Sequence, residues 1–117
     1  MAAFEAVFVS GDPRFVDYTP GADVPAGEVI PLLGAAAAGG VGIPHLDMKS
    51  GVLGAVAIAD GVYSVPGDAA IALGTLVYWN DTSNQAKATS TGNRQLGYAI
   101  TACTGAAARF NVYVQPA

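Results

Sequence analysis

The sequence predicts an all-β protein, folded as a single-domain β-sandwich or β-barrel of about eight or nine short strands. Short apolar runs recur about every 8–12 residues, and clusters of Gly, Pro, Asp and Asn separate them. The 117-residue chain contains 15 glycines and 7 prolines, which interrupt each longer apolar stretch. The last apolar run alternates strictly between large apolar and polar side chains, which is typical of a half-buried strand.

Turn residues divide the first half of the chain into short extended segments. Residues 10–13, with the sequence Ser-Gly-Asp-Pro, are expected to end the first strand. Pro31 lies inside a later segment, which we therefore expect at a sheet edge or a bulge, because proline lacks an amide hydrogen. The strands expected in this half cover residues 4–9, 14–19, 28–33, 40–46 and 53–59.

Asp60 and Gly61 separate two strand candidates in the middle of the chain. Asp-Gly pairs favour the two-residue turn of a β-hairpin, because both residues of that turn take positive φ angles. We therefore expect the strand over residues 53–59 to fold back as a strand over residues 62–65.

The second half of the chain contains one ambiguous segment, residues 68–73. Its Ala and Leu residues favour a helix that Asp68 is able to cap, but Gly74 would end that helix after a turn or two. At most one short helix is therefore expected. The strands expected after it cover residues 75–79, 87–91, 95–101 and 109–114. In the last of them, alternation places the three large apolar side chains on one buried face.

The length fits one domain, which we divide into an N-terminal extended segment, residues 1–20, and a β domain, residues 21–117. The aromatic residues of the N-terminal segment are Phe4, Phe8, Phe15 and Tyr18. Two interpretations of this segment remain open. Either it forms the first strand of the β domain, or it lies along a neighbouring chain as an added strand.

Charged residues make up 12% of the chain, about half of the ~25% found in an average soluble domain. The 5 basic and 9 acidic residues give a formal net charge of -4 at pH 7, which argues against a nucleic-acid-binding surface. A thinly charged monomer would have little solubilising surface, whereas a chain that covers its outside with other protein needs less. We therefore expect a homo-oligomer.

The N-terminus carries an acidic residue and no cationic segment, so the sequence predicts no secretory signal peptide. The longest uncharged run contains Pro31, Pro44 and several glycines, all of which disfavour a continuous helix. A membrane-spanning segment is therefore not expected either.

The residues that usually carry chemistry are too few or too scattered to form a catalytic or metal site. His45 and Cys103 are the only histidine and cysteine, so a site with several histidines and a disulfide framework are both excluded. The acidic residues are spread singly, mostly beside Gly or Pro, where carboxylates cap turns. We therefore predict no cofactor, no metal and no enzymatic activity, and we expect Cys103 to be a small buried side chain.

Tyr78 and Trp79 stand at the end of a predicted strand, beside Asn80 and Asp81. They allow two interpretations. In one, the rings form a stacking platform, and the protein is a binding module for a glycan or peptide displayed on a virion or cell surface. In the other, one ring lies in the core and the other at a rim or interface.

Short, glycine-centred motifs run through most of the chain. They are Val24-Pro-Ala-Gly-Glu-Val29, Gly61-Val-Tyr-Ser-Val-Pro66, Leu73-Gly-Thr-Leu-Val-Tyr-Trp-Asn-Asp81, Lys87-Ala-Thr89, Gly92-Asn93, Leu96-Gly-Tyr-Ala99 and Val112-Tyr-Val114. This series resembles a family of small capsid decoration, or cement, proteins that are encoded among the head genes of tailed phages. The resemblance covers roughly residues 18–114. It departs from the family pattern at Asn80, where the family has Asp directly after the tryptophan, and at the Ala/Gly run over residues 35–40.

The resemblance implies a β-rich structural protein that binds the outer face of an assembled capsid, bridges neighbouring major capsid subunits and stabilises the shell. The partner it implies is the major capsid protein, and a trimer is expected in preference to a dimer. The protein would be made in the host cytoplasm and reside on the virion exterior. No catalytic residue comes with the family. The candidate contact residues are the aromatic ones named above: Phe4, Phe8, Phe15, Tyr18, Tyr78 and Trp79.

Overall fold

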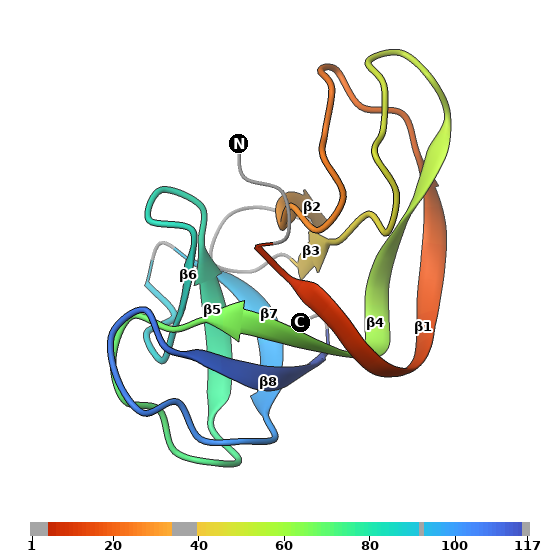
Figure 1. Cartoon of the computed structure of the whole chain (residues 1–117). Helices are drawn as coiled ribbons and strands as arrows, with labels where there is room; N and C mark the ends of the chain where they lie inside the picture. Colours follow the sequence, from red (N-terminus) through yellow and green to blue (C-terminus); the bar gives the residue numbers. More distant parts are fainter. Residues whose placement is uncertain (1–4, 34–39, 92, 116–117) are drawn as a thin grey trace.

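The computed structural model describes residues 5–33, 40–91 and 93–115, and these residues form eight strands and no helix (Figure 1). The strands are β1 (Val7–Tyr18), β2 (Ile30–Leu33), β3 (Gly40–Gly42), β4 (Gly54–Pro66), β5 (Leu76–Asn80), β6 (Gln85–Lys87), β7 (Arg94–Ala99) and β8 (Arg109–Val114). The predicted all-β class is confirmed.

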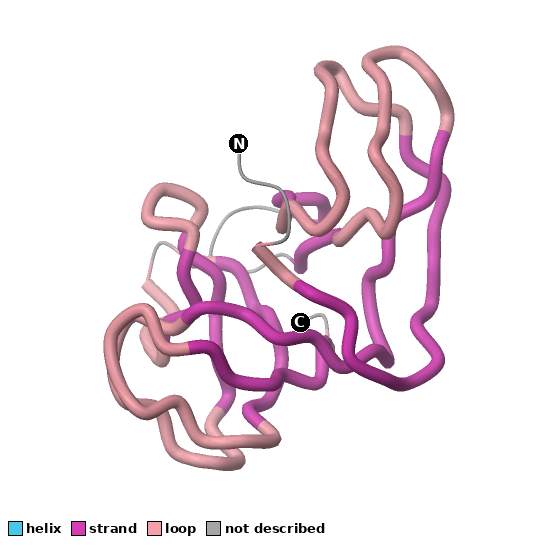
Figure 2. The backbone as a smooth tube through the Cα atoms, in the orientation of Figure 1, coloured by secondary structure: helices cyan, strands magenta, loops and turns pink. Residues whose placement is uncertain are grey.

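Six of the strands form one antiparallel sheet in the order β1-β4-β8-β7-β5-β6, and β2 pairs with β3 in a second, two-stranded sheet. Gly67, directly after β4, forms a parallel bridge with Ala86 of β6, and the Asp68 amide donates to the Ala86 carbonyl at 3.1 Å. This bridge brings the end of β4 next to β6, the last strand of the sheet. The five strands β4-β8-β7-β5-β6 therefore close into a small barrel (Figure 2).

β1 and β4 are the longest strands, with 12 and 13 residues, and they pair with each other along most of their length. Residues 62–66 of β4 also pair with β8 and belong to the barrel, whereas residues 54–59 pair with β1 outside it. In Figure 1 the two strands rise side by side from the barrel at the right. We call this pair of strands the bent ribbon.

The hairpin expected at Asp60 and Gly61 does not form, because β4 runs through both residues. Asp60 takes a φ angle of 69°, and the facing part of β1 has a register shift between Gly11 and Arg14. The Asp-Gly pair therefore belongs to a bulge, which bends both strands instead of reversing the chain. Gly11 is required here, since a Cβ atom on it would lie 2.9 Å from the Asp60 carbonyl oxygen.

The strand end expected at residues 10–13 is also wrong, because β1 continues from Val7 to Tyr18. Pro13 is tolerated within β1 because this strand is at the edge of the sheet, where a missing amide hydrogen costs no ladder hydrogen bond. The described part of the N-terminal segment thus pairs within its own chain. An additional contact with a neighbouring chain stays a prediction.

Residues 68–73 form a bend followed by an isolated β-bridge, and no helix. Within them, the Ile71 amide donates to the Cys103 carbonyl at 3.0 Å, and the Cys103 amide donates back to Ile71 at 2.8 Å. This bridge holds the segment extended, which outweighs the helix propensity of its alanines. Pro31 behaves as expected, since it lies in the two-stranded sheet beside a register shift.

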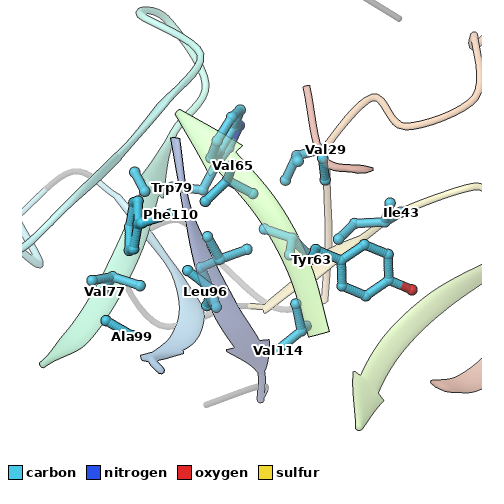
Figure 3. Packing of buried hydrophobic residues seen from close by; sticks show 14 of the residues in the cluster. Val29, Ile43, Tyr63, Val65, Val77, Trp79, Leu96, Ala99, Phe110 and Val114 are labelled. Atoms are coloured by element: carbon cyan, nitrogen blue, oxygen red, sulfur yellow. The ribbon is translucent and has the colours of Figure 1, made fainter. Parts of the chain in front are cut away.

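The main core fills the barrel (Figure 3). Phe110, Val112 and Val114 of β8 are buried on one face, as the alternation predicts. Trp79 of β5 and Leu96 of β7 belong to the same cluster. Each such side chain contributes about 1.5–3 kcal/mol when it is fully buried, so this cluster is the main source of stability.

A second, smaller core lies where the bent ribbon leaves the barrel. Its buried residues are Val24, Ile30, Met48 and Val56, with Val16, Tyr18, Leu32 and Ile58 packed against them. Two backbone hydrogen bonds between Val24 and Met48, of 2.9 and 2.8 Å, join the loops over residues 19–29 and 43–53. This core fixes both loops against the ribbon.

Candidate interaction surface

Exposed apolar side chains gather on a surface formed by β1 and the loop over residues 43–53. On β1, Phe8 and Phe15 are each 44% exposed, and in the loop Leu46 is 79% exposed. We call this surface the aromatic face, and its residues are Phe8, Phe15, His45, Leu46, Val52 and Leu53. Tyr63 is only 1% exposed, and its ring packs against Phe8 and His45 from the core side. Contiguous apolar surface of this kind marks a contact site for protein or for another apolar partner.

His45 stands at the centre of the aromatic face. Its ring centroid lies 4.9 Å from that of Phe15, 5.1 Å from that of Phe8 and 5.6 Å from that of Tyr63. The Nε2 atom of His45 shares a hydrogen bond of 2.5 Å with the Tyr63 hydroxyl. Burial lowers the pKa of His45 and raises that of Tyr63, so both side chains are neutral at pH 7.

The register of the bent ribbon positions these rings. Phe15 of β1 lies opposite Ala57 of β4, and Phe8 lies opposite Tyr63. Ala57 is small, and two 2.9 Å backbone hydrogen bonds join it to Ile43, where the loop begins. The loop therefore starts directly against the ribbon and carries His45 to the phenylalanine rings.

Two aspartates hold the loop from the other side. The Asp23 carboxylate accepts a 2.8 Å hydrogen bond from the Ser50 amide and lies 3.7 Å from the Lys49 ammonium. The Asp47 carboxylate accepts a 2.9 Å hydrogen bond from the Ala26 amide. These bonds fix the turns at both ends of the loop tip, so its apolar residues are presented in a defined position.

The aromatic face is hollowed on both sides of His45. A cavity of about 460 Å³ lies between Phe15 and the loop, and Leu46, Val52 and Leu53 line it. A cavity of about 220 Å³ lies on the other side, and Phe8 lines that one. The surface thus offers pockets for protruding side chains as well as exposed rings.

The structure distributes the six candidate contact residues over several places. Phe8 and Phe15 come together on the aromatic face, whereas Tyr18 packs against the second core. Phe4 lies outside the described residues.

Tyr78 is half-buried, and Trp79 is only 1% exposed. Successive residues of a strand point to opposite faces, so these two rings do not form an exposed platform together.

Several residues of the aromatic face were not expected from the sequence. No sequence motif marks Leu46, Val52, Leu53 or Tyr63 as part of a contact site, and His45 stands out in the sequence only as the single histidine. One signal was available: Val52 and Leu53 form an apolar pair between Gly51 and Gly54, directly after the polar residues Lys49 and Ser50. Apolar side chains at a turn tip have no core to enter and often contact a partner.

A second apolar row crosses the outer face of the barrel. The register places Val62, Tyr113, Tyr98 and Leu76 next to one another on β4, β8, β7 and β5. Tyr98 is 46% exposed, and the Tyr113 hydroxyl donates a 2.8 Å hydrogen bond to Asp60. We call these four residues the outer row, and they lie on elements that the aromatic face largely does not use.

The described residues contain no group of three or more His, Cys, Asp or Glu that is able to hold a metal ion. Cys103 is buried as a free thiol, with Sγ 3.3 Å from the Gly105 carbonyl oxygen and 3.5 Å from that of Ala108. None of the described residues lies in a helix long and apolar enough to cross a membrane.

Comparison with known proteins identifies the family. No curated protein and no solved structure matches the chain significantly. A family model described as phage cement protein matches residues 9–115, which is almost the entire chain and includes the outer row and, except for Phe8, the aromatic face. The chain therefore belongs to the phage cement protein family, whose role is structural and whose members stabilise capsids.

Proposed function

We propose that this cement protein binds the outer face of an assembled phage head through its aromatic face and bridges neighbouring major capsid subunits. The observation that carries the proposal is the exposed, hollowed cluster of Phe8, Phe15 and His45, in a chain that belongs to a capsid-stabilising family. Bridging requires two contacts on different subunits. The outer row supplies a second apolar surface on other strands.

Co-sedimentation with empty heads of the source phage tests the proposal. The double variant Phe8→Ser and Phe15→Ser should bind heads at least about tenfold more weakly, because burial of one phenylalanine contributes about 1.5–3 kcal/mol. Leu73→Ser is the matched control, since Leu73 is also exposed and apolar but lies in the turn before β5. Wild-type protein that stays in the supernatant, or a double variant that binds heads as tightly as wild type, would contradict the proposal.

The proposal includes self-association as a homo-oligomer, with three copies rather than two. One feature supports self-association: only 12% of the residues are charged. Surfaces that stay covered in an assembly need fewer charges than the surface of a monomer. Light scattering of the free protein tests the point, and a monomeric mass at all attainable concentrations would contradict it.

A further inference from the structure

A third cavity, of about 380 Å³, lies away from the aromatic face. It is lined by the end of β1, the loop after it, the start of β2 and the turn between β5 and β6. Of the residues that the structure describes, Glu5, Glu28 and Asp81 line it with carboxylates, and no lysine, arginine or histidine lines it. The rest of its wall is mainly apolar and includes Tyr18, Pro20, Val24, Ile30 and Pro31.

Two of these carboxylates are buried. Glu5 and Glu28 are each 6% exposed, although glutamate is seldom buried unless it has a partner. The Oε1 atom of Glu5 accepts a 2.9 Å hydrogen bond from the Val29 amide. The Oε1 atom of Glu28 is buried and has no hydrogen-bond donor among the described residues. A buried acceptor without a donor is costly, so a donor supplied by a ligand in this cavity would bind favourably.

The electrostatics of the cavity favour a cation. Burial raises the pKa of Glu28 and the neighbouring Glu5 charge raises it further, whereas the positive charge of the N-terminus lowers the pKa of both glutamates by a smaller amount. Burial likewise raises the pKa of Glu5 and of Asp81, against an opposing backbone hydrogen bond at Glu5 and the Arg94 charge at Asp81. A cation placed among the three groups would stabilise their ionised forms.

The shape of the cavity indicates which cation it takes. A bare metal ion does not fit, because the described carboxylates are not arranged as a metal-binding group. A lysine or arginine side chain combines a charged head that donates hydrogen bonds with an apolar stem. The head matches Glu5, Glu28 and Asp81, and the stem matches the apolar wall.

We propose that this cavity binds a basic side chain, lysine or arginine, that the capsid partner presents on its surface. This inference rests on the proposed function, because it takes the partner to be capsid protein. It adds a charged, selective contact to the apolar one, since the cavity would reject a partner without a basic residue at that place.

NMR titration of the free protein tests the site without heads. The probes are N-acetyl-argininamide and N-acetyl-lysinamide, with uncharged N-acetyl-citrullinamide as the isosteric control. We expect a charged probe, but not the citrulline compound, to shift the amide signals of Val29 and Asn84 in a saturable manner. Glu28→Gln and, separately, Asp81→Asn should weaken this binding about tenfold, because each removes a charge-assisted contact.

Asp12→Asn is the matched control, since Asp12 is an exposed acid on β1 and does not line the cavity. Absence of a saturable shift with both charged probes, or equal affinity in the wild-type protein and the Glu28→Gln variant, would overturn the inference. Co-sedimentation separates the two proposals. Wild-type and Glu28→Gln proteins that bind heads equally would refute the basic-side-chain site alone, whereas wild-type protein that does not bind heads would refute the proposed function.

Discussion

His45 is the one side chain of the aromatic face whose charge changes near neutral pH. It contacts Phe8 and Phe15 and shares a hydrogen bond with the Tyr63 hydroxyl. Its neutral form suits an apolar contact, whereas its protonated form would place a positive charge among the rings. Burial already favours the neutral form in the free protein.

The first prediction is that head binding weakens in mild acid. The pKa of His45 in the free folded protein lies below its ordinary value of 6.5, so the ring is neutral above that value and suits an apolar contact there. The ring gains a proton as the pH falls through this lowered pKa, and head binding weakens over that range because a covered apolar face disfavours the charged form. A covering partner would lower that pKa further. Co-sedimentation at about pH 7.5 and about pH 5.5 should show the loss, and His45→Phe should remove most of it. An unchanged pH dependence in His45→Phe would contradict the prediction.

The second prediction concerns Glu28, whose pKa in the folded protein is raised above 4.5. An acid with a raised pKa loses stability as the pH rises from its unfolded value through its folded one, because the folded state holds the proton more tightly. Glu28→Gln should therefore raise the free energy of unfolding by about 1 kcal/mol at pH 7. Urea denaturation should show little gain below about pH 4, where the carboxyl is protonated in both states. A gain of equal size at both pH values would point to a different cause.

At the scale of the element, a residue that favours a positive φ angle is found both in hairpin turns and in β-bulges. Asp60 and Gly61 suggested a hairpin, and the positive φ of Asp60 is real. Whether such a residue reverses a chain or bends a strand depends on the strand opposite, here the Gly11 region of β1, which is about 50 residues away in the sequence. By contrast, β8 follows its own alternation, and its bounds are those expected from the sequence.

The candidate site was predictable only in part, because its residues are brought together by pairing between segments that are far apart in the sequence. Phe8 and Phe15 could be proposed because they are aromatic residues in a segment rich in turns. Their neighbours, His45 and Tyr63, come from distant parts of the chain and reach them only through the β1–β4 pairing and the Ile43–Ala57 bridge. Trp79 could not be assigned to the core from the sequence, since the closure of the barrel decides which face of β5 is covered.

The third prediction explains a glycine of the Leu-Gly-Tyr-Ala motif. Gly97 has a φ angle of 155°, and a Cβ atom on it would lie 1.9 Å from the Tyr113 carbonyl oxygen of β8. Gly97→Ala should therefore separate β7 from β8 and lower the free energy of unfolding by about 3 kcal/mol or more. Gly21→Ala is the control, because a Cβ atom there meets nothing within 4 Å. Equal denaturation midpoints for the two variants would contradict this explanation.

At the scale of the whole molecule, two apolar surfaces on a thinly charged chain lead to the fourth prediction. A protein that binds only the assembled shell stabilises it by mass action, so the effect grows with the logarithm of free protein concentration above the dissociation constant. Thermal disruption of heads, followed by light scattering, should therefore shift upward as protein is added. The Phe8→Ser and Phe15→Ser variant should need about tenfold more protein for the same shift. A shift that is independent of concentration would contradict stabilisation by binding.

The buried thiol of Cys103 allows local opening of the barrel to be measured by the rate of chemical labelling. It is the only thiol in the chain, and it is buried. Its backbone pairs with Ile71, and its Sγ atom contacts the carbonyl oxygen of Ala108, just before β8. A thiol reagent reaches it only when that part of the barrel opens, so the rate of labelling reports the frequency of opening. The same measurement on protein bound to heads would compare how often the barrel opens in the two states, with no engineered probe.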